Sequence, residues 1–135
     1  MSEATVREAL ATAAATVSGL RASGYMPAVI KPPHAVVVPG EFDPRMVLAE
    51  SKTERVYEVV LFTAKNAPEA SQKLLDTYCE LSGSTSVIAA IQTATALNNG
   101  ATADYAEVVA VSGLEVTPNE GVEYLTRKLT VEVVF

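Results

Sequence analysis

The chain has 135 residues, of which 49% are hydrophobic and 19% charged, so it can build one folded core and does not have a disordered composition. Its formal net charge of −6 argues against tight binding to nucleic acid, which depends on Lys and Arg neutralising phosphates. A single cysteine excludes an intramolecular disulfide.

The N-terminal residues are polar and acidic, which is not typical of a signal peptide. The longest aliphatic stretch without a charge is interrupted by Thr, Ser and Gly, so no stretch is suited to spanning a bilayer. We therefore expect one domain over residues 1–135, without a membrane partner, that stays inside the cell or inside a particle assembled there.

Residues 3–18 are predicted to form a helix, because Val6, Leu10 and Val17 recur at helical spacing and Gly19 can end it. Residues 19–33 are expected to be irregular, since they contain two glycines and three prolines. A short β-branched strand follows at 35–38.

Residues 40–53 form a connection that is longer than a hairpin needs, and long loops are commonly functional or mobile. Residues 54–64 give the clearest strand pattern, since most of them are β-branched, aromatic or aliphatic.

A second helix is predicted to open at 66–69, where Pro68 suits a first turn. Its expected buried stripe consists of Leu74, Leu75, Tyr78 and Leu81. Residues 82–86 then break the chain, Ser84 is the expected cap of a third helix, and residues 98–100 end that helix.

Two long strands, 105–116 and 122–135, flank a turn at 117–121 with Pro, Asn and Gly. The predicted order is α-β-β-α-α-β-β. This order predicts an α+β fold in which an antiparallel sheet of about four strands has helices packed on one face.

The strands at 56–62 and 106–114 carry apolar residues on both faces, as expected for strands that are covered twice. The helices can cover one face. The second face needs the long loop, a curled sheet or a neighbouring subunit, and the pattern alone does not choose between them.

Groups that could do chemistry are few. His34 at a strand entry and Cys79 beside a helical apolar stripe could form a base and a nucleophile, but an ordinary polar residue and a buried thiol explain them more simply. They have no recognisable metal-ligand spacing.

Two further segments could bind an ion, but each has a simpler structural explanation. Residues 82–86 precede a helix and could hold an anion, yet they lack the Lys of a phosphate-binding loop, and capping explains their hydroxyls. The carboxylates Glu41, Asp43 and Glu50 share the long loop with Arg45 and Lys52, which can pair with them. We expect no cofactor, no metal and no enzymatic activity.

The order of segments resembles the tail terminator proteins of long-tailed phages, especially those infecting actinobacteria. The likeness extends over nearly the whole chain and lies in order and spacing, without a catalytic signature. It is carried by the following segments: Val6-Arg7-Glu8-Ala9-Leu10, Val17-Ser18-Gly19-Leu20, Lys31-Pro32-Pro33-His34 with Ala35-Val36-Val37-Val38, Tyr57-Glu58-Val59-Val60-Leu61, Ala70-Ser71-Gln72-Lys73-Leu74-Leu75-Asp76, Ser82-Gly83-Ser84-Thr85-Ser86 with Val87-Ile88-Ala89-Ala90-Ile91, Glu123-Tyr124-Leu125, and Leu129-Thr130-Val131-Glu132-Val133.

This resemblance implies a small α+β subunit of a hexameric ring in the virion, assembled in the host cytoplasm. The ring would cap the tail tube, end its growth and join the tail to the head connector, while double-stranded DNA passes through without sequence-specific binding. The partners would be copies of the chain, the major tail tube protein and the head connector protein.

The family has no active-site motif to transfer, so the expected contact with a neighbour or the tube is placed in the long loop. The residues are Phe42, Asp43, Arg45, Met46 and Lys52. The alternatives are another head–tail connector or head-closure component, or a small-molecule enzyme or binding module that uses His34 and Cys79.

Overall fold

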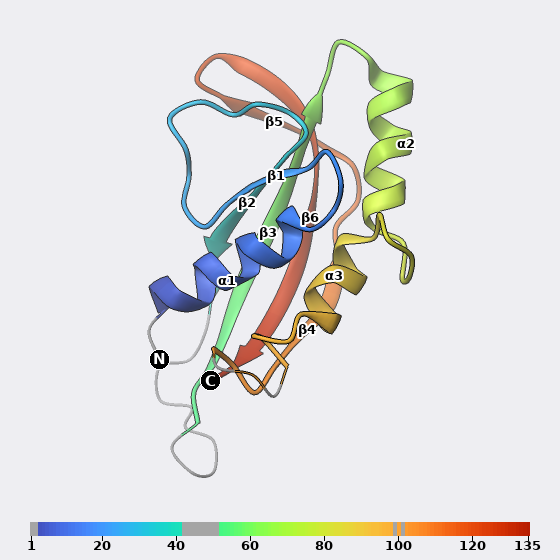
Figure 1. The fold of residues 1–135 in the computed structure, drawn as a ribbon. Coiled ribbons are helices and arrows are strands. Elements are labelled where there is room, and N and C mark those ends of the chain that lie inside the picture. The colour runs from blue at the N-terminus through green and yellow to red at the C-terminus, as the bar shows by residue number, and fades with distance from the viewer. Residues whose placement is uncertain (1–2, 42–51, 99, 101) are drawn as a thin grey trace.

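The computed structural model describes residues 3–41, 52–98, 100 and 102–135. The elements are α1 (Glu3–Ala15), β1 (Arg21–Ser23), β2 (His34–Pro39), β3 (Glu54–Ala64), α2 (Pro68–Tyr78), α3 (Val87–Thr93), β4 (Tyr105–Val111), β5 (Glu115–Asn119) and β6 (Val122–Val134), as Figure 1 shows.

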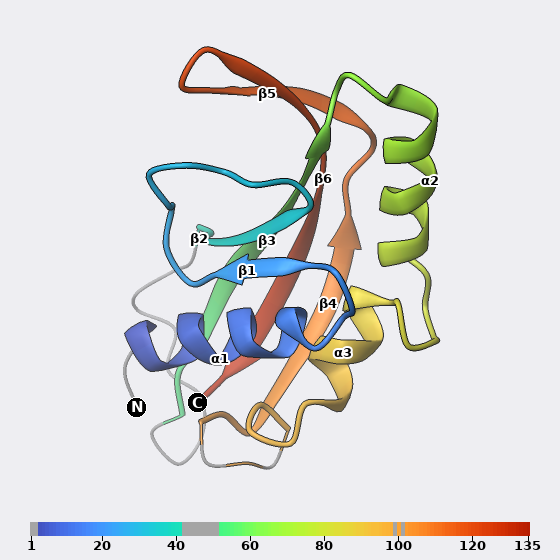
Figure 2. The ribbon, with the colours of Figure 1, turned by 45° about the horizontal axis from the view of Figure 1, so that its top comes forward.

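The strands form one mixed sheet in the order β1-β2-β3-β6-β4, with β5 also paired to β6. β1 runs parallel to β2, and the other pairs are antiparallel. β3 lies along one side of β6, while β4 and β5 follow each other along its other side (Figure 2). β1 and the β4–β5 pair are therefore the two outer edges of the sheet.

The predicted α+β class is confirmed, but the sheet of about four antiparallel strands was wrong. Residues 19–33 contain a strand, β1, which pairs parallel to β2 and makes the sheet mixed. The strand expected over 105–116 is divided into β4 and β5, since residues 112–114 leave the strand conformation. The strand expected over 54–64 is present with the same bounds.

All three helices pack on one face of the sheet, as expected. Their apolar residues share a single core cluster with alternate residues of the strands, among them Val59 in β3 and Leu129 and Val131 in β6. These three side chains are fully buried. None of the helices within the described ranges is long and apolar enough to cross a membrane.

The helix ends differ from the predicted ones. α1 stops at Ala15, and Val17 then donates to the Ala14 carbonyl in a tighter turn that leads to Gly19, which has a φ of +81°. α2 stops at Tyr78, so Leu81 is not part of its buried stripe and is 83% exposed.

The second face of the sheet is partly covered by the chain itself, through the segment 24–33. Ile30 in this segment packs against Val36, Val60, Phe62 and Tyr124. The rings of Phe62 and Tyr124 meet edge to face, with centroids 5.6 Å apart. The segment 24–33, which was expected only to be irregular, therefore covers part of the second face of the sheet. The apolar residues on both faces of the strand at 56–62 required such a cover.

Arg7 in α1 holds the start of this segment in place. Its Nε donates to the Gly24 carbonyl at 2.7 Å, and its terminal NH2 nitrogen donates to the Val37 carbonyl at 3.0 Å. Its guanidinium carbon lies 3.9 Å from the centroid of the Tyr25 ring, a cation–π contact. A helix on one face thus fixes a loop that closes the other.

Candidate functional site

His34 is hydrogen-bonded through both ring nitrogens. It lies on the same face of the sheet as the cluster formed by Ile30, Val36, Val60, Phe62 and Tyr124. Nδ1 accepts the Lys31 backbone N–H at 3.3 Å, so the ring proton lies on Nε2, which is 2.8 Å from the Ser23 hydroxyl. Burial, and then the nearby Arg21 charge, lower the pKa of His34 below its ordinary value of 6.5. The ring is a neutral connector between β1, β2 and the segment that joins them.

Cys79 lies on the other side of the sheet. It caps the C-terminus of α2, where its N–H donates to the Leu75 carbonyl at 3.1 Å. Its side chain packs against the core cluster that lies between the sheet and the three helices. His34 pairs with Phe62 in the register and shares the opposite face. Burial raises the pKa of the Cys79 thiol, and the Arg127 charge opposes this shift. The two residues do not form a nucleophile–base pair.

The hydroxyl-rich segment 82–86 serves helix capping. Ser86, rather than the expected Ser84, is the N-cap of α3, because its side chain accepts the Ala89 N–H at 3.0 Å. The same hydroxyl donates to the Glu80 carbonyl. Ser84 is exposed. The cap therefore also ties α3 to the end of α2.

The long loop that carried the predicted interface lies mostly outside the described residues. Phe42, Asp43, Arg45 and Met46 belong to the undescribed range 42–51, as does Glu50. Lys52 is described, and its ammonium lies 3.1 Å from a carboxylate oxygen of Asp104. This ion pair connects the residues that precede β3 and β4. An interface role for the five predicted residues stays a prediction.

Metal-ligating side chains do not gather in the described part of the chain. No group of three or more His, Cys, Asp or Glu residues there lies close enough to hold an ion. Glu41, the described carboxylate of the predicted acidic set, is exposed.

The outer edge formed by β4 and β5 includes the segment 106–114, which the sequence showed to be apolar on both faces. It carries a run of large apolar side chains that are 37–49% exposed, namely Val109, Val111, Leu114 and Val116. The register shifts between Val108 and Ala110, which breaks the strict in–out alternation of this strand. The sequence signal was present in the apolar residues on both faces, but exposure depends on the strand being outermost.

This edge is protected against the addition of another strand. The N–H groups of Ala106 and Val108 donate to side-chain carbonyls of Asn98 and Gln92, at 3.3 and 3.1 Å. Pro118 in β5 has no N–H to offer. Together with the bulge, these features are typical of natural edges that resist β-sheet extension.

The hairpin of β5 and β6 extends beyond the body of the sheet (Figure 2). Its turn is made by Glu120 and Gly121, with φ values of 52° and 78°, between the paired residues Asn119 and Val122. Two positive φ values are what a two-residue turn in a twisted hairpin requires. Val122 beside the turn is 51% exposed.

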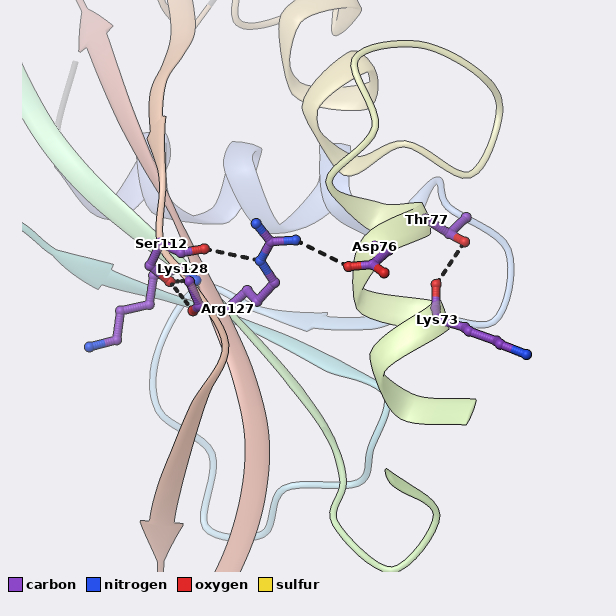
Figure 3. A network of polar contacts seen from close by, with 7 residues as sticks. Lys73, Asp76, Thr77, Ser112, Arg127 and Lys128 are labelled. Atoms are coloured by element: carbon purple, nitrogen blue, oxygen red, sulfur yellow. Dashed lines mark hydrogen bonds and ion pairs between the residues drawn. The ribbon is translucent and has the colours of Figure 1, made fainter. Parts of the chain in front are cut away.

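Arg127 anchors the point at which β4 gives way to β5. Its Nε donates to the Ser112 carbonyl at 3.0 Å, and one of its terminal nitrogens lies 3.4 Å from a carboxylate oxygen of Asp76 in α2 (Figure 3). Ser112 in turn accepts the Lys128 N–H on its hydroxyl at 2.8 Å. The hairpin is thus tied to a helix at its base.

An open hollow of about 780 Å³ lies between the hairpin, the end of β3 and Pro32. Tyr124 and Val122 line it, and the ion pair of Lys65 and Glu123, at 3.1 Å, stands beside them. The walls of this hollow are mostly apolar. A scan against models of known protein families finds no match for this chain, and a search of curated proteins finds none either.

Proposed function

We propose that this chain is a structural subunit of a ring that caps the tail tube of a long-tailed phage, a tail terminator. In this role it ends growth of the tube and joins the tail to the head connector, in the virion, while DNA passes through the ring. The resemblance in segment order motivates the proposal.

The observation that supports it best is the run of exposed apolar side chains on the β4–β5 edge. Isolated exposed apolar residues are common, whereas several of them gathered on one outer edge indicate a contact surface. Here Val109, Val111, Leu114 and Val116 follow one another along one outer edge, and the hairpin extends from it. A subunit that must contact identical neighbours and a tube needs surfaces of this kind.

The positions of His34 and Cys79 favour a structural role over small-molecule chemistry. They lie on opposite faces of the sheet, the imidazole is bonded at both nitrogens, and burial raises the pKa of the thiol. The imidazole and the thiol are therefore not brought together.

The test is to place a nonsense codon early in the gene in the phage that carries it, and to examine the particles by electron microscopy. We expect filled heads beside unattached tails of abnormal length, because an uncapped tube keeps growing. A plasmid copy of the wild-type gene should restore normal particles, which controls for polar effects. Normal particles without the protein would refute the proposal, and separated tails of normal length would indicate another connector component.

A further inference from the structure

Some Lys and Arg side chains of this acidic chain form ion pairs with carboxylates, and others do not. Six of them form ion pairs with carboxylates, namely Lys52, Arg55, Lys65, Lys73, Arg127 and Lys128. Arg7 is held by two backbone carbonyls and the Tyr25 ring. Of the remaining described cations, Arg21 and Lys31 have no ion pair with any residue in the described ranges.

Arg21 and Lys31 lie together at the outer strand β1. Arg21 belongs to β1 and donates to the Lys31 carbonyl at 3.3 Å, and both side chains are exposed. Tyr25 and Met26, which follow β1 after Gly24, are 47% and 51% exposed. This end of the sheet, the basic edge, therefore combines positive charge with uncovered apolar surface.

The opposite outer edge has the complementary character. Besides its exposed apolar row, it carries Glu107 in β4, whose nearest cross-strand neighbour is another carboxylate, Glu132. Glu115 in β5 is exposed and has a single, long contact with Lys128, at 3.7 Å. We call this the acidic edge.

We infer that the acidic edge of one copy docks against the basic edge of the next copy, head to tail. Arg21 and Lys31 then meet Glu107 and Glu115, and the apolar residues of both edges cover each other. The inference rests on the proposed ring and names the contact that builds it. A contact between two different edges of identical subunits closes into a ring or continues as a filament.

The charges disfavour a two-fold contact between two copies of the same edge. Two acidic edges facing each other would place Glu107 and Glu115 against their own copies, and like charges across an interface are strongly unfavourable. Side chains make the contact, because Gln92, Asn98 and Pro118 block strand addition along much of the acidic edge.

The test uses two charge-reversed versions of the full chain in sedimentation velocity. One carries Arg21→Glu and Lys31→Glu, so both of its edges are acidic; the other carries Glu107→Lys and Glu115→Lys, so both are basic. We expect the wild type to form species larger than a dimer and each variant alone to bind itself about a hundredfold more weakly, since like charges then meet. An equimolar mixture should recover the large species, because each variant complements the other at both contacts.

A matched control has Lys65→Glu and Lys73→Glu, which changes the net charge as much as the first variant but at exposed residues that belong to none of the edge strands β1, β4 and β5. It should assemble like the wild type. A monomeric wild type, variants that assemble normally, or a mixture that stays dissociated would each overturn the inference. Circular dichroism of every variant verifies the fold.

The same variants separate this inference from the proposed function. In the phage with the nonsense codon, neither variant alone should restore normal tails, and the two expressed together should. If either alone restores them, the contact is wrong and the terminator function stands. If charge reversal controls assembly but particles without the protein are normal, the contact stands and the function is wrong.

Discussion

Replacing Arg127 with Met tests whether the guanidinium stabilises the sheet through a backbone bond or through its ion pair. Methionine keeps an apolar stem of similar length, so the change removes chiefly the charge and its hydrogen bonds. The bond from Nε to the Ser112 carbonyl is 3.0 Å long and partly buried, and a hydrogen bond to a charged donor contributes about 1.5–3 kcal/mol. We therefore expect the free energy of unfolding to fall by about 2 kcal/mol.

The ion pair with Asp76 should add little. Its atoms are 3.4 Å apart and the Asp76 side chain is 75% exposed, and exposed pairs contribute at most about 1 kcal/mol. Asp76→Asn should accordingly cost less than about 0.5 kcal/mol. Urea unfolding of the two single variants and the double variant, at one fixed protein concentration, gives the coupling energy directly.

A coupling energy above about 1.5 kcal/mol would refute this reasoning, since it would place the stabilisation in the ion pair. Hydrogen exchange supplies a second readout. Arg127→Met should speed exchange of the Ser112 and Lys128 amides, whose bonds lie at the same junction, and Asp76→Asn should leave both unchanged.

Three further predictions concern the fold. The single histidine, His34, should titrate below pH 6.5 by NMR, because burial and Arg21 favour its neutral form. The folded state then binds fewer protons than the unfolded state, so the free energy of unfolding should fall as the pH is lowered through 6.5. A titration midpoint above pH 6.5 would contradict this prediction. Ser86→Ala should lower the free energy of unfolding by about 1 kcal/mol, while Ser84→Ala should change it by less than about 0.5 kcal/mol; equal losses would show that Ser86 is not the cap. Leu129→Ala should cost about 2–5 kcal/mol in urea unfolding, and a loss below about 1 kcal/mol would mean that the core relaxes around the missing side chain.

The parts of the fold that local sequence determines were predicted well. The strand over 54–64 has a dense run of β-formers, and in the last strand Leu129 and Val131 alternate with polar residues, so both were found. The strand β1 was missed because its three residues, Arg21–Ser23, owe their conformation to pairing with β2 rather than to their own preferences.

The surfaces were harder to predict than the elements. That Val109 and Val111 are exposed follows from β4 being an outer strand, which the sequence of the strand itself does not show. Likewise, the separation of His34 from Cys79 follows from the register of β2 and the side on which α2 packs. Both are properties of long-range pairing.

The position of β6 in the sheet affects how the chain can fold during synthesis. β6 pairs with β3, β4 and β5, and it follows all three in the chain. The contact between Glu54 and Val134 closes one of its longest loops. Pairings between distant residues form slowly, because a large loop must close first. β3 therefore leaves the ribosome with one neighbour missing, and its apolar residues need protection, for example by chaperones, until β6 has been made.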